Sequence, residues 1–429
     1  MLKPRHIALL AAALFCTGCG SGDGSGEPAG WDRAAKVLST VPSDALSVTY
    51  SESSRHLPPC IDSSSVFDGL GLERLRTGLA LSLCFNGSTV PVLTLAPIRS
   101  REAEDSTSAL NGTMGLARAK GLEVEFIPDA PALEEGEGAL IITPSSPQMR
   151  VARRHIGEGR SILDAENFRQ AAFAAHGASQ MTVMRNSGAR RLPGMTLLEG
   201  VYAAGAISDF LHTAAQWTTF VPEGDGTVEV IPTPYPAGIC YYQMLGSLPE
   251  SRIRLGEVLP AGTETVVALA LPEGFRAAYE GYLDAEVRLS SYRRHLEVLG
   301  KNCGKSPLDW EKEIDFKEIG LVVSNGHKAV FLRPAKKAED FGVRTNPYPG
   351  FVHALYGSAF RLRDDSAIAC SRGWYIIGSE ADVQALAPAQ DDRQERLEWH
   401  SRPGHFVISS SGRIMAWDKN GIRIWNSNQ

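Results

Sequence analysis

The chain contains 429 residues, of which 43% are hydrophobic and 21% are charged. A chain of this length and composition buries a substantial core and divides into about two or three domains. Its formal net charge of −6 excludes the basic excess that binding to a phosphate backbone requires, so we expect no nucleic-acid partner.

The first nineteen residues have the pattern of a bacterial lipoprotein signal. A basic start precedes the apolar run 7–15, and residues 16–19 read Cys-Thr-Gly-Cys, with the small residues that a lipoprotein signal peptidase requires. We therefore expect a signal peptide over 1–18, cleavage before Cys19 and lipidation of Cys19. The apolar run is too short to cross a hydrocarbon core of roughly 30 Å as a helix. An ordinary secretory signal is the alternative interpretation.

Residues 19–30 are rich in glycine and serine and predict a flexible tether. About eleven such residues span roughly 18 Å on average, enough to hold a folded body clear of a membrane. The residue immediately after Cys19 is glycine and not aspartate, which, by resemblance to envelope lipoproteins, argues against retention in the inner membrane. We expect a protein of the outer membrane that is attached through its N-terminal lipid and faces the periplasm.

The body of the chain shows the same order of signals twice. A proline-marked turn leads into an alternating strand at 46–50 and again at 265–270. An Asn-Gly pair, which tolerates the positive φ of a tight hairpin turn, follows at Asn86 and at Asn325. Each hairpin precedes a second strand pair and a serine-capped helix. The predicted hairpins are 79–93 and 319–332, the strand pairs are 123–126 with 139–142 and 360–362 with 374–377, and the helices begin near Ser146 and Ser379.

Three further helices and one strand fill the gaps. Apolar residues at three-to-five-residue spacing predict a helix over 280–300 that ends at Gly300. Similar stripes predict helices over 168–173, after Asp164, and over 197–211, while 227–231 alternates as a strand beside the last of these. The predicted fold class is α+β, with two related α/β-sandwich-like modules whose largely antiparallel sheets are flanked by helices.

The last residues predict a short β-meander with strands over 405–409, 412–417 and 421–425. The Asp-x-x-Gly-x-x-x-Trp spacing from Asp418 to Trp425 resembles one blade of a quinoprotein-like β-propeller. Since a propeller needs about four to eight blades, we favour a terminal meander packed on the main body over the relic of a longer propeller. The predicted divisions are the signal peptide 1–18, the tether 19–30, the modules 31–255 and 256–390, and the meander 391–429.

Several of these features occur together in a known group of proteins. They are the proline-marked turns at Pro42 and Pro260, the segment around Trp217, the helix ending at Gly300, and Lys317-Glu318-Ile319. In these features the chain resembles an uncharacterised family of bacterial envelope lipoproteins, common in gut and oral Bacteroidota. The likeness covers Trp31 to about Ala389. It implies repeated α+β modules and an envelope location, and it implies no chemistry.

The spacing of the cysteines predicts neither a set of disulfide bonds nor a zinc site. Five follow Cys19, and none of them lies in a Cys-x-x-Cys pair. Because five is an odd number, we expect at least one free thiol, and we expect most of the others to be buried structural residues. No paired-ligand spacing supports a zinc site. The five are Cys60, Cys84, Cys240, Cys303 and Cys370.

No recognised catalytic, phosphate-binding or calcium-binding motif occurs in the sequence. His176 lies three residues before Ser179, but the intervening Gly177 favours a helix end over a nucleophile and its base. His400 and His405 lack a third metal ligand at a recognisable spacing.

Two basic triplets and one acidic cluster are the remaining candidates. The triplets Arg153-Arg154-His155 and Arg293-Arg294-His295 could bind an anionic sugar, a lipid headgroup or a peptidoglycan carboxylate, although a solvated helix face is the commoner meaning. Glu134, Glu135 and Glu137 could hold a divalent cation, although a flexible acidic loop is commoner.

The sequence therefore predicts no catalytic residue, cofactor or metal. Our first hypothesis is a lipid-anchored, non-catalytic binding or scaffold protein whose partner is another envelope protein or a polymer in the periplasm. The alternative is a hydrolase of envelope glycans or peptides with a site assembled between the two modules. Converging carboxylates, or a serine and histidine at hydrogen-bond distance in a deep pocket, would favour the hydrolase. A shallow apolar cleft between the modules would favour binding.

Overall fold

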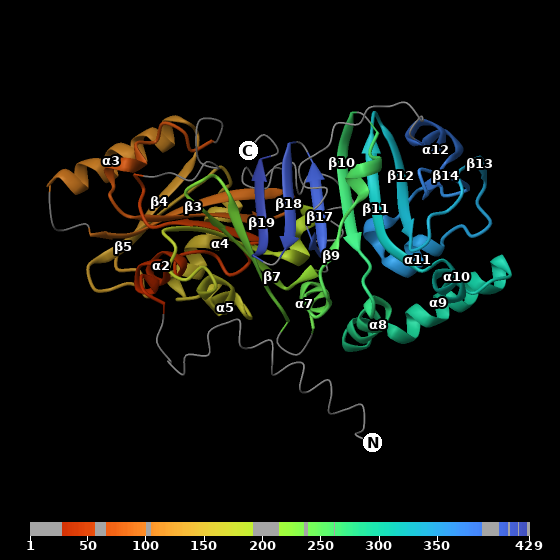
Figure 1. Cartoon of the computed structure of the whole chain (residues 1–429). Helices are drawn as coiled ribbons and strands as arrows, with labels where there is room; N and C mark the ends of the chain where they lie inside the picture. The colour runs from red at the N-terminus through yellow and green to blue at the C-terminus, as the bar shows by residue number, and fades with distance from the viewer. Residues whose placement is uncertain are drawn as a thin grey trace, which may run out of the picture.

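A computed structural model describes residues 28–55, 66–99, 104–191, 214–235, 239–260, 262–387, 403–410, 412–418 and 420–426. The predicted signal peptide, Cys19, Cys60, the helix over 197–211 and His400 lie outside these residues. The described chain is a mixed α+β protein built on one large antiparallel sheet (Figure 1). Within the described ranges, no helix is long and apolar enough to cross a membrane.

The sheet contains seventeen strands. We call β1 to β8 the first half-sheet and the nine later strands the second half-sheet. The first comprises β1 (Ser47–Ser51), β2 (Gly78–Phe85), β3 (Thr89–Arg99), β4 (Glu123–Ile127), β5 (Glu137–Thr143), β6 (Gln180–Arg185), β7 (Trp217–Pro222) and β8 (Val228–Thr233). The second comprises β10 (Thr263–Ala270), β11 (Phe316–Ser324), β12 (His327–Pro334), β13 (Phe341–Thr345), β14 (Ala367–Ser371), β15 (Trp374–Gly378), β17 (Phe406–Ser410), β18 (Arg413–Asp418) and β19 (Gly421–Asn426). A separate short ladder joins β9 (Ser251–Arg252) to β16 (Pro403–Gly404).

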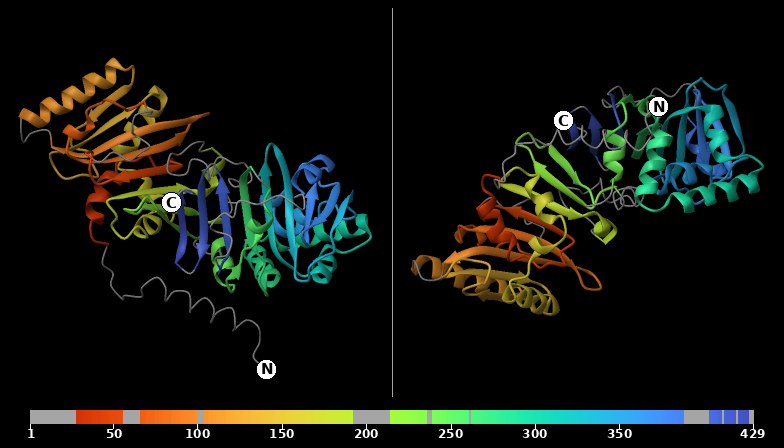
Figure 2. Two further views of the ribbon diagram at one scale, coloured as in Figure 1. Left: turned by 45° about the horizontal axis from the view of Figure 1, so that its top comes forward. Right: turned by 90° about the horizontal axis from the view of Figure 1, so that it is seen from below.

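The two half-sheets have the same strand order, read outward from where they meet. The first runs β8-β7-β6-β1-β2-β3-β5-β4. The second runs β19-β18-β17-β10-β11-β12-β15-β14, with β13 added at its outer edge. β8 pairs antiparallel with β19, so the final strand of each half-sheet forms the junction. All of these pairings are antiparallel. The two half-sheets follow each other in an elongated body (Figure 2).

The strands expected over 405–409, 412–417 and 421–425 are present as β17, β18 and β19. They continue the main sheet and are hydrogen-bonded into it on both sides, because β17 pairs with β10 and β19 pairs with β8. Trp417 is partly buried and packs on Tyr242 and Phe406.

Both predicted Asn-Gly hairpins are confirmed, with different turns. Asn325 (φ 50°) and Gly326 (φ 78°) form the two-residue turn between β11 and β12, as a primed turn requires. The β2–β3 turn has one more residue, and within it Gly87 has a positive φ of 75°. The predicted pairing of 123–126 with 139–142 is also confirmed, as β4 with β5.

The predicted strand 360–362 is wrong. Residues Ser358–Phe360 form the 3-10 turn η6, and β14 is the strand that pairs with β15. Phe360 is buried in the helical layer directly after α11 (Phe351–Tyr356). Its bulk therefore serves helix packing, whereas β14 is built from the smaller residues Ala-Ile-Ala-Cys-Ser.

The single helix predicted over 280–300 is also wrong, because two helices occupy that region. α8 (Phe275–Ala285) and α9 (Leu289–Cys303) are separated at Val287, whose φ of 57° cannot belong to an α-helix. α9 continues past Gly300, which lies against Ser306 and Pro307. The helix is terminated by Gly304 in the left-handed conformation.

Helices cover both faces of the sheet. On one face, α2 (Trp31–Leu38), α4 (Ser146–Gly157) and α5 (Phe168–Phe173) pack on the first half-sheet, and η5 (Leu255–Val258) and α12 (Glu380–Leu386) pack on the second. On the other face, α3 (Glu104–Ala119) covers the first half-sheet, and α7 (Tyr241–Gly246), α8, α10 (Pro307–Ile314) and α11 pack on the second. α4 and α12 begin after Ser145 and Ser379, whose side chains accept from Gln148 N and Asp382 N.

The β8–β19 junction generates a stability prediction. Glu229 lies directly opposite Arg423, and the buried pairs Val230 with Ile422 and Val228 with Ile424 flank them. Arg423→Glu would place two carboxylates opposite each other and lower the free energy of unfolding by about 1 kcal/mol. Arg423 also pairs with Glu223 at 3.7 Å, so combining Glu229→Arg with Arg423→Glu should recover only part of that loss in urea denaturation. Equal destabilisation in the single and the double variant would contradict this register.

Candidate functional site

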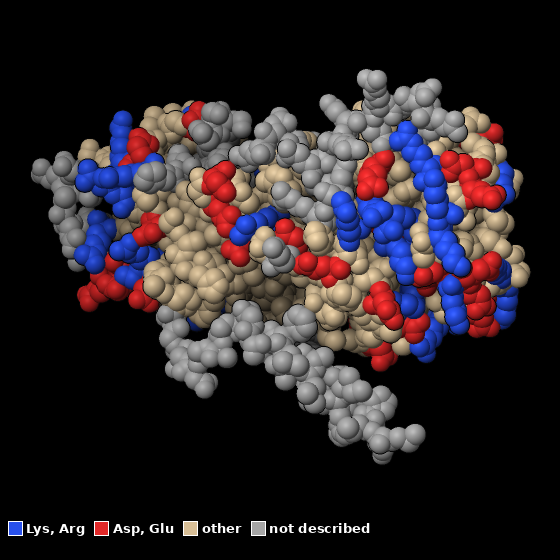
Figure 3. All heavy atoms as spheres, viewed as in Figure 1, with Lys and Arg blue, Asp and Glu red and all other residues tan. Residues whose placement is uncertain are grey.

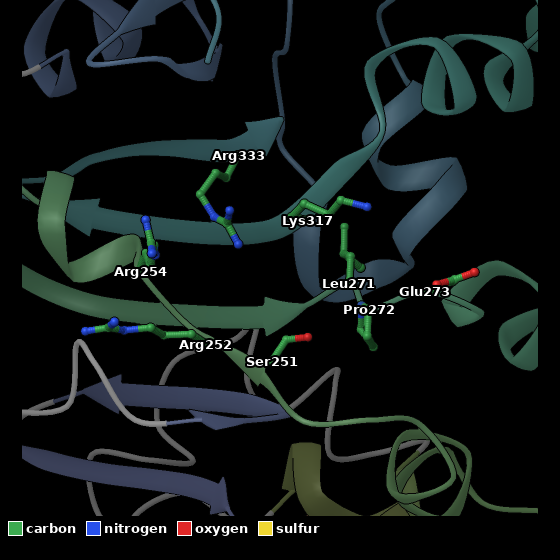
Figure 4. Close-up of a pocket in the computed structure, with 8 residues that line it drawn as sticks. All are labelled: Ser251, Arg252, Arg254, Leu271, Pro272, Glu273, Lys317 and Arg333. Carbon is green, nitrogen blue, oxygen red and sulfur yellow. The ribbon is translucent and has the colours of Figure 1, made fainter. Parts of the chain in front are cut away.

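The main candidate site is a cavity of about 360 Å³ where β10, β11 and β12 end near the β9 segment. Figure 4 shows its lining side chains. Four of the eight are cationic: Arg252, Arg254, Lys317 and Arg333. Figure 3 shows basic side chains gathered over this part of the second half-sheet. The remaining lining residues are Ser251, Leu271, Pro272 and Glu273. We call this cavity the basic pocket.

Local structure explains how the arginines of the β9 segment reach the basic pocket. Ile253 is fully buried, so its neighbours Arg252 and Arg254 are exposed on either side of it. The segment continues into η5, whose Leu255 packs directly on Gly320 of β11. A Cβ at Gly320 would lie 2.1 Å from Leu255 Cδ2. Only glycine therefore allows η5 to approach β11 so closely.

Glu318 is fully buried and contacts two of the pocket residues, Arg254 and Arg333. Its carboxylate accepts hydrogen bonds from Arg254 N at 2.8 and 3.0 Å, from Leu255 N at 2.8 Å and from Arg333 Nε at 3.2 Å. Burial raises the pKa of Glu318 to about 7, while the backbone donors and Arg333 oppose that rise. Glu318 thus ties together the β9 segment and β12, which carry three of the four cations.

The charges of the pocket are only partly compensated. Lys317 Nζ lies 2.7 Å from Asp315, and Arg333 pairs with Glu318. Arg252 and Arg254 have no carboxylate within ion-pair distance in the described part of the chain. Glu273 points away from the arginines in Figure 4. Counting the described residues alone, the pocket is therefore positive, with two guanidinium groups that have no ion-pair partner among them.

At the matching strand ends the first half-sheet carries an arginine, Arg99 of β3, but it is paired with the buried Glu137. There Ser51 of β1 pairs with Leu79 of β2, and Gly78 pairs with Ala96 of β3. The cavity near the end of β1 is only about 20 Å³. The basic pocket is therefore a property of particular residues and not of the strand order.

The predicted acidic cluster is neutralised by basic partners. Glu137 is buried and lies 3.3 Å from both Lys36 Nζ and Arg99 Nε, and Glu134 lies 2.7 Å from Lys36 Nζ. Glu135 is exposed. Within the described ranges, no three side chains of histidine, cysteine, aspartate or glutamate are grouped to hold a metal ion.

The predicted basic triplets do not form binding surfaces of three cations. Arg153 pairs with Glu125 at 3.6 Å, and the neighbouring His155 is buried, which lowers its pKa. In α9, Arg293 pairs with Glu280 at 2.6 Å, while Arg294 and His295 are exposed. These triplets thus lie mainly on helix surfaces.

The candidate histidines serve structural roles. His176 (φ 48°) and Gly177 (φ 76°) form the turn after α5, as expected for a helix end. His405 is buried against Trp417, with ring centroids 4.7 Å apart, and burial lowers its pKa.

The described cysteines are free thiols, and three of the four are buried. Burial raises the pKa of Cys84 to about 12 and that of Cys370 to about 11, which suppresses the thiolate that nucleophilic catalysis needs. The expectation that most cysteines are buried is confirmed for Cys84, Cys240 and Cys370.

A dense ion-pair cluster elsewhere is structural. Arg276 donates to Glu311 at 2.6 and 2.8 Å and to Tyr292 Oη at 2.6 Å, and it lies over the rings of Tyr279 and Tyr356. These contacts hold α8, α9, α10 and α11 together. The guanidinium is already fully engaged, so it offers no binding site.

Sequence analysis missed the pocket residues because they are distant along the chain. The only available signals were the alternation Ser-Arg-Ile-Arg-Leu at 251–255 and the charged pair Lys317-Glu318 inside an apolar strand. Neither signal predicts that these two segments lie next to Arg333 in the folded protein.

No protein family, curated protein or solved structure matches this chain.

The raised pKa of Glu318 should make the free energy of unfolding depend on pH. Its pKa is raised from 4.5 to about 7, so the folded state binds more protons than the unfolded state between these values. Its contribution to the free energy of unfolding is therefore present below pH 4.5 and lost as the pH rises through 7. Glu318→Gln should lower that free energy by about 1–3 kcal/mol at pH 5, because it leaves buried donors poorly paired.

The difference between wild type and Glu318→Gln should shrink from pH 5 to pH 8 in urea denaturation. A difference that stays constant or grows over this range would contradict the direction of the pKa shift.

Proposed function

We propose that this protein is a non-catalytic binding protein of the cell envelope, held at the outer membrane by lipid on Cys19, which binds an anionic ligand in the basic pocket. The main support is that two arginines lining the cavity, Arg252 and Arg254, have no ion-pair partner among the described residues. Exposed guanidinium groups next to a concave surface are well suited to carboxylate or phosphate oxygens.

The lining supports binding more than hydrolysis. In the portion of the chain that the structure describes, it includes one serine, one carboxylate and no histidine. A hydrolase would need a pair of carboxylates or an activated hydroxyl, with a general base in reach. The cations can hold an anion, but they offer no group to accept a proton at pH 7.

We also propose that the body consists of two copies of one eight-stranded module. Support comes from the identical strand order, from hairpins at Asn86-Gly87 and Asn325-Gly326, and from a junction made by the last strand of each copy. Under this proposal β17, β18 and β19 complete the second module, as β6, β7 and β8 complete the first.

The proposed anchor is tested by Cys19→Ser in the full-length chain. This variant cannot be acylated, so the mature protein should move from the membrane to the soluble fraction after cell disruption. Mass spectrometry of the wild-type N-terminus provides the direct comparison. Retention of the variant in the membrane, or an unprocessed wild-type N-terminus, would refute lipid anchoring.

Anion binding is tested by thermal unfolding with anions at matched ionic strength. A ligand that binds only the folded state raises the Tm with concentration and approaches about 2.7 kcal/mol of stabilisation at 100 times its Kd. We expect at least one among phosphate, glycerol 3-phosphate, citrate and succinate to raise the Tm of the wild type more than that of Arg252→Gln/Arg254→Gln.

The matched control for this experiment is Arg118→Gln/Arg150→Gln, which removes two exposed arginines of the first half. It should respond to anions as the wild type does, because general salt effects act on both. Identical responses of all three proteins to every anion would refute the pocket as the binding site.

A further inference from the structure

The arrangement of charge in the basic pocket restricts the class of its ligand. On the basis of the proposed function, we infer that the pocket binds an organic phosphomonoester. Its doubly charged phosphate group would be held by Arg254 and Arg333. The inference depends on the direction, the number and the surroundings of the cations.

The cations approach from separate elements. Arg254 lies on the β9 segment, Lys317 on β11 and Arg333 on β12. In Figure 4, Arg333 reaches across β11 toward the β9 segment. A planar carboxylate is satisfied by one coplanar guanidinium fork, whereas a tetrahedral phosphate directs its oxygens toward several sides and suits donors from different elements.

The charge of the pocket also matches a dianion. Lys317 and Arg333 each have an acidic partner, at 2.7 and 3.2 Å. The two uncompensated charges are those of Arg252 and Arg254 in the described part of the chain. A phosphomonoester carries a charge of about −1.5 to −2 at pH 7, so it would compensate Arg254 by direct contact and Arg252 as a nearby charge of the same pocket.

Glu318 acts as a positioning residue for this group. It holds Arg333 through Nε only, which leaves the two Nη groups of the guanidinium available for a ligand. Its two oxygens also fix the backbone at Arg254 and Leu255. Glu318 thereby fixes the position of Arg254 on the β9 segment and of Arg333 near the end of β12.

The size and walls of the cavity indicate a larger molecule than a free ion. A volume of about 360 Å³ corresponds to roughly twelve water molecules at about 30 Å³ each. Leu271 and Pro272 provide an apolar wall, and Ser251 and Glu273 provide polar groups beside it. These residues suit an organic substituent that carries hydroxyl or amino groups.

The test is isothermal titration of the full folded protein at pH 8, where a phosphomonoester is fully dianionic because its second pKa is about 6. The probes are glycerol 3-phosphate, inorganic phosphate and succinate, the last being a carboxylate dianion of matched charge. We expect glycerol 3-phosphate to bind at least about tenfold more tightly than succinate. Arg252→Gln/Arg254→Gln should weaken it by about tenfold or more, and Arg118→Gln/Arg150→Gln by less than twofold.

The source of the phosphate is distinguished by vesicles. Capture on phosphatidic acid vesicles but not on phosphatidylcholine vesicles, with loss of capture in Arg252→Gln/Arg254→Gln, supports a lipid phosphomonoester. Binding of glycerol 3-phosphate without such capture supports a soluble or polymer-borne phosphomonoester.

Two results would overturn the inference in different ways. Succinate binding as tightly as glycerol 3-phosphate, with both weakened in Arg252→Gln/Arg254→Gln, would reject the phosphate class and leave anion binding standing. No binding of any probe at millimolar concentration, together with no anion-dependent rise in Tm, would reject the proposed function as well. Unchanged Tm values of the ligand-free variants would confirm that the substitutions leave the fold intact.

Discussion

The pairing of β8 with β19 is the interaction on which the whole architecture depends. An unpaired edge strand exposes a row of backbone donors and acceptors that can template association with another chain. Each half-sheet ends in such a strand, and antiparallel pairing between Val228–Val230 and Ile422–Ile424 satisfies both at once. The apolar residues of these strands are buried in one core together with residues of both half-sheets. The two remaining edges, β4 and β13, contain Glu123, Glu125 and Arg344, and charged residues of this kind discourage further pairing.

The basic pocket shows how one topology can acquire a site in one half only. Glu318 and Arg333 lie opposite each other at the ends of β11 and β12, whereas the end of the β2–β3 ladder holds the pair Gly78 and Ala96 and, next to it, Leu79 and Leu95. A buried carboxylate is costly unless it is hydrogen-bonded, and Glu318 receives bonds from two backbone amides and one guanidinium. Gly320 allows η5 to lie close enough to supply those amides. The positive surface thus depends on one acid and one glycine as much as on its arginines.

Local chemistry explains which elements could be predicted from the sequence. Both Asn-Gly hairpins depend on φ preferences of two adjacent residues, and serine caps depend on one side chain and the next turn, so both were identified. The break at Val287 was missed because a β-branched residue with positive φ contradicts every local preference. Phe360 was assigned to a strand because apolar bulk suits either a strand or a buried helical turn. The pairing of β17 with β10 and of β19 with β8 joins segments far apart in sequence, and no local pattern encodes it.

The candidate site was less predictable than the fold for the same reason. In the sequence, none of Arg252, Lys317 and Arg333 lies in a motif that predicts a binding site. They line one cavity only because the fold brings the ends of their strands together. By contrast, Glu134, Glu135 and Glu137 formed a conspicuous run in the sequence. Two of these carboxylates proved to be engaged by Lys36 and Arg99, which come from other elements. Proximity along the chain was therefore a poor guide to binding chemistry here.

The strand order has a mechanical consequence. β1 directly follows the N-terminal helix α2, and seven inter-strand steps separate it from β10, beside which the basic pocket opens. At about 4.8 Å per step these amount to roughly 34 Å measured along the sheet. Because hydrogen bonds link each of these strands to the next, the sheet is rigid over this distance. The pocket therefore keeps a fixed lateral distance from α2, and only the predicted tether before α2 would let the whole body move relative to an attachment at the N-terminus.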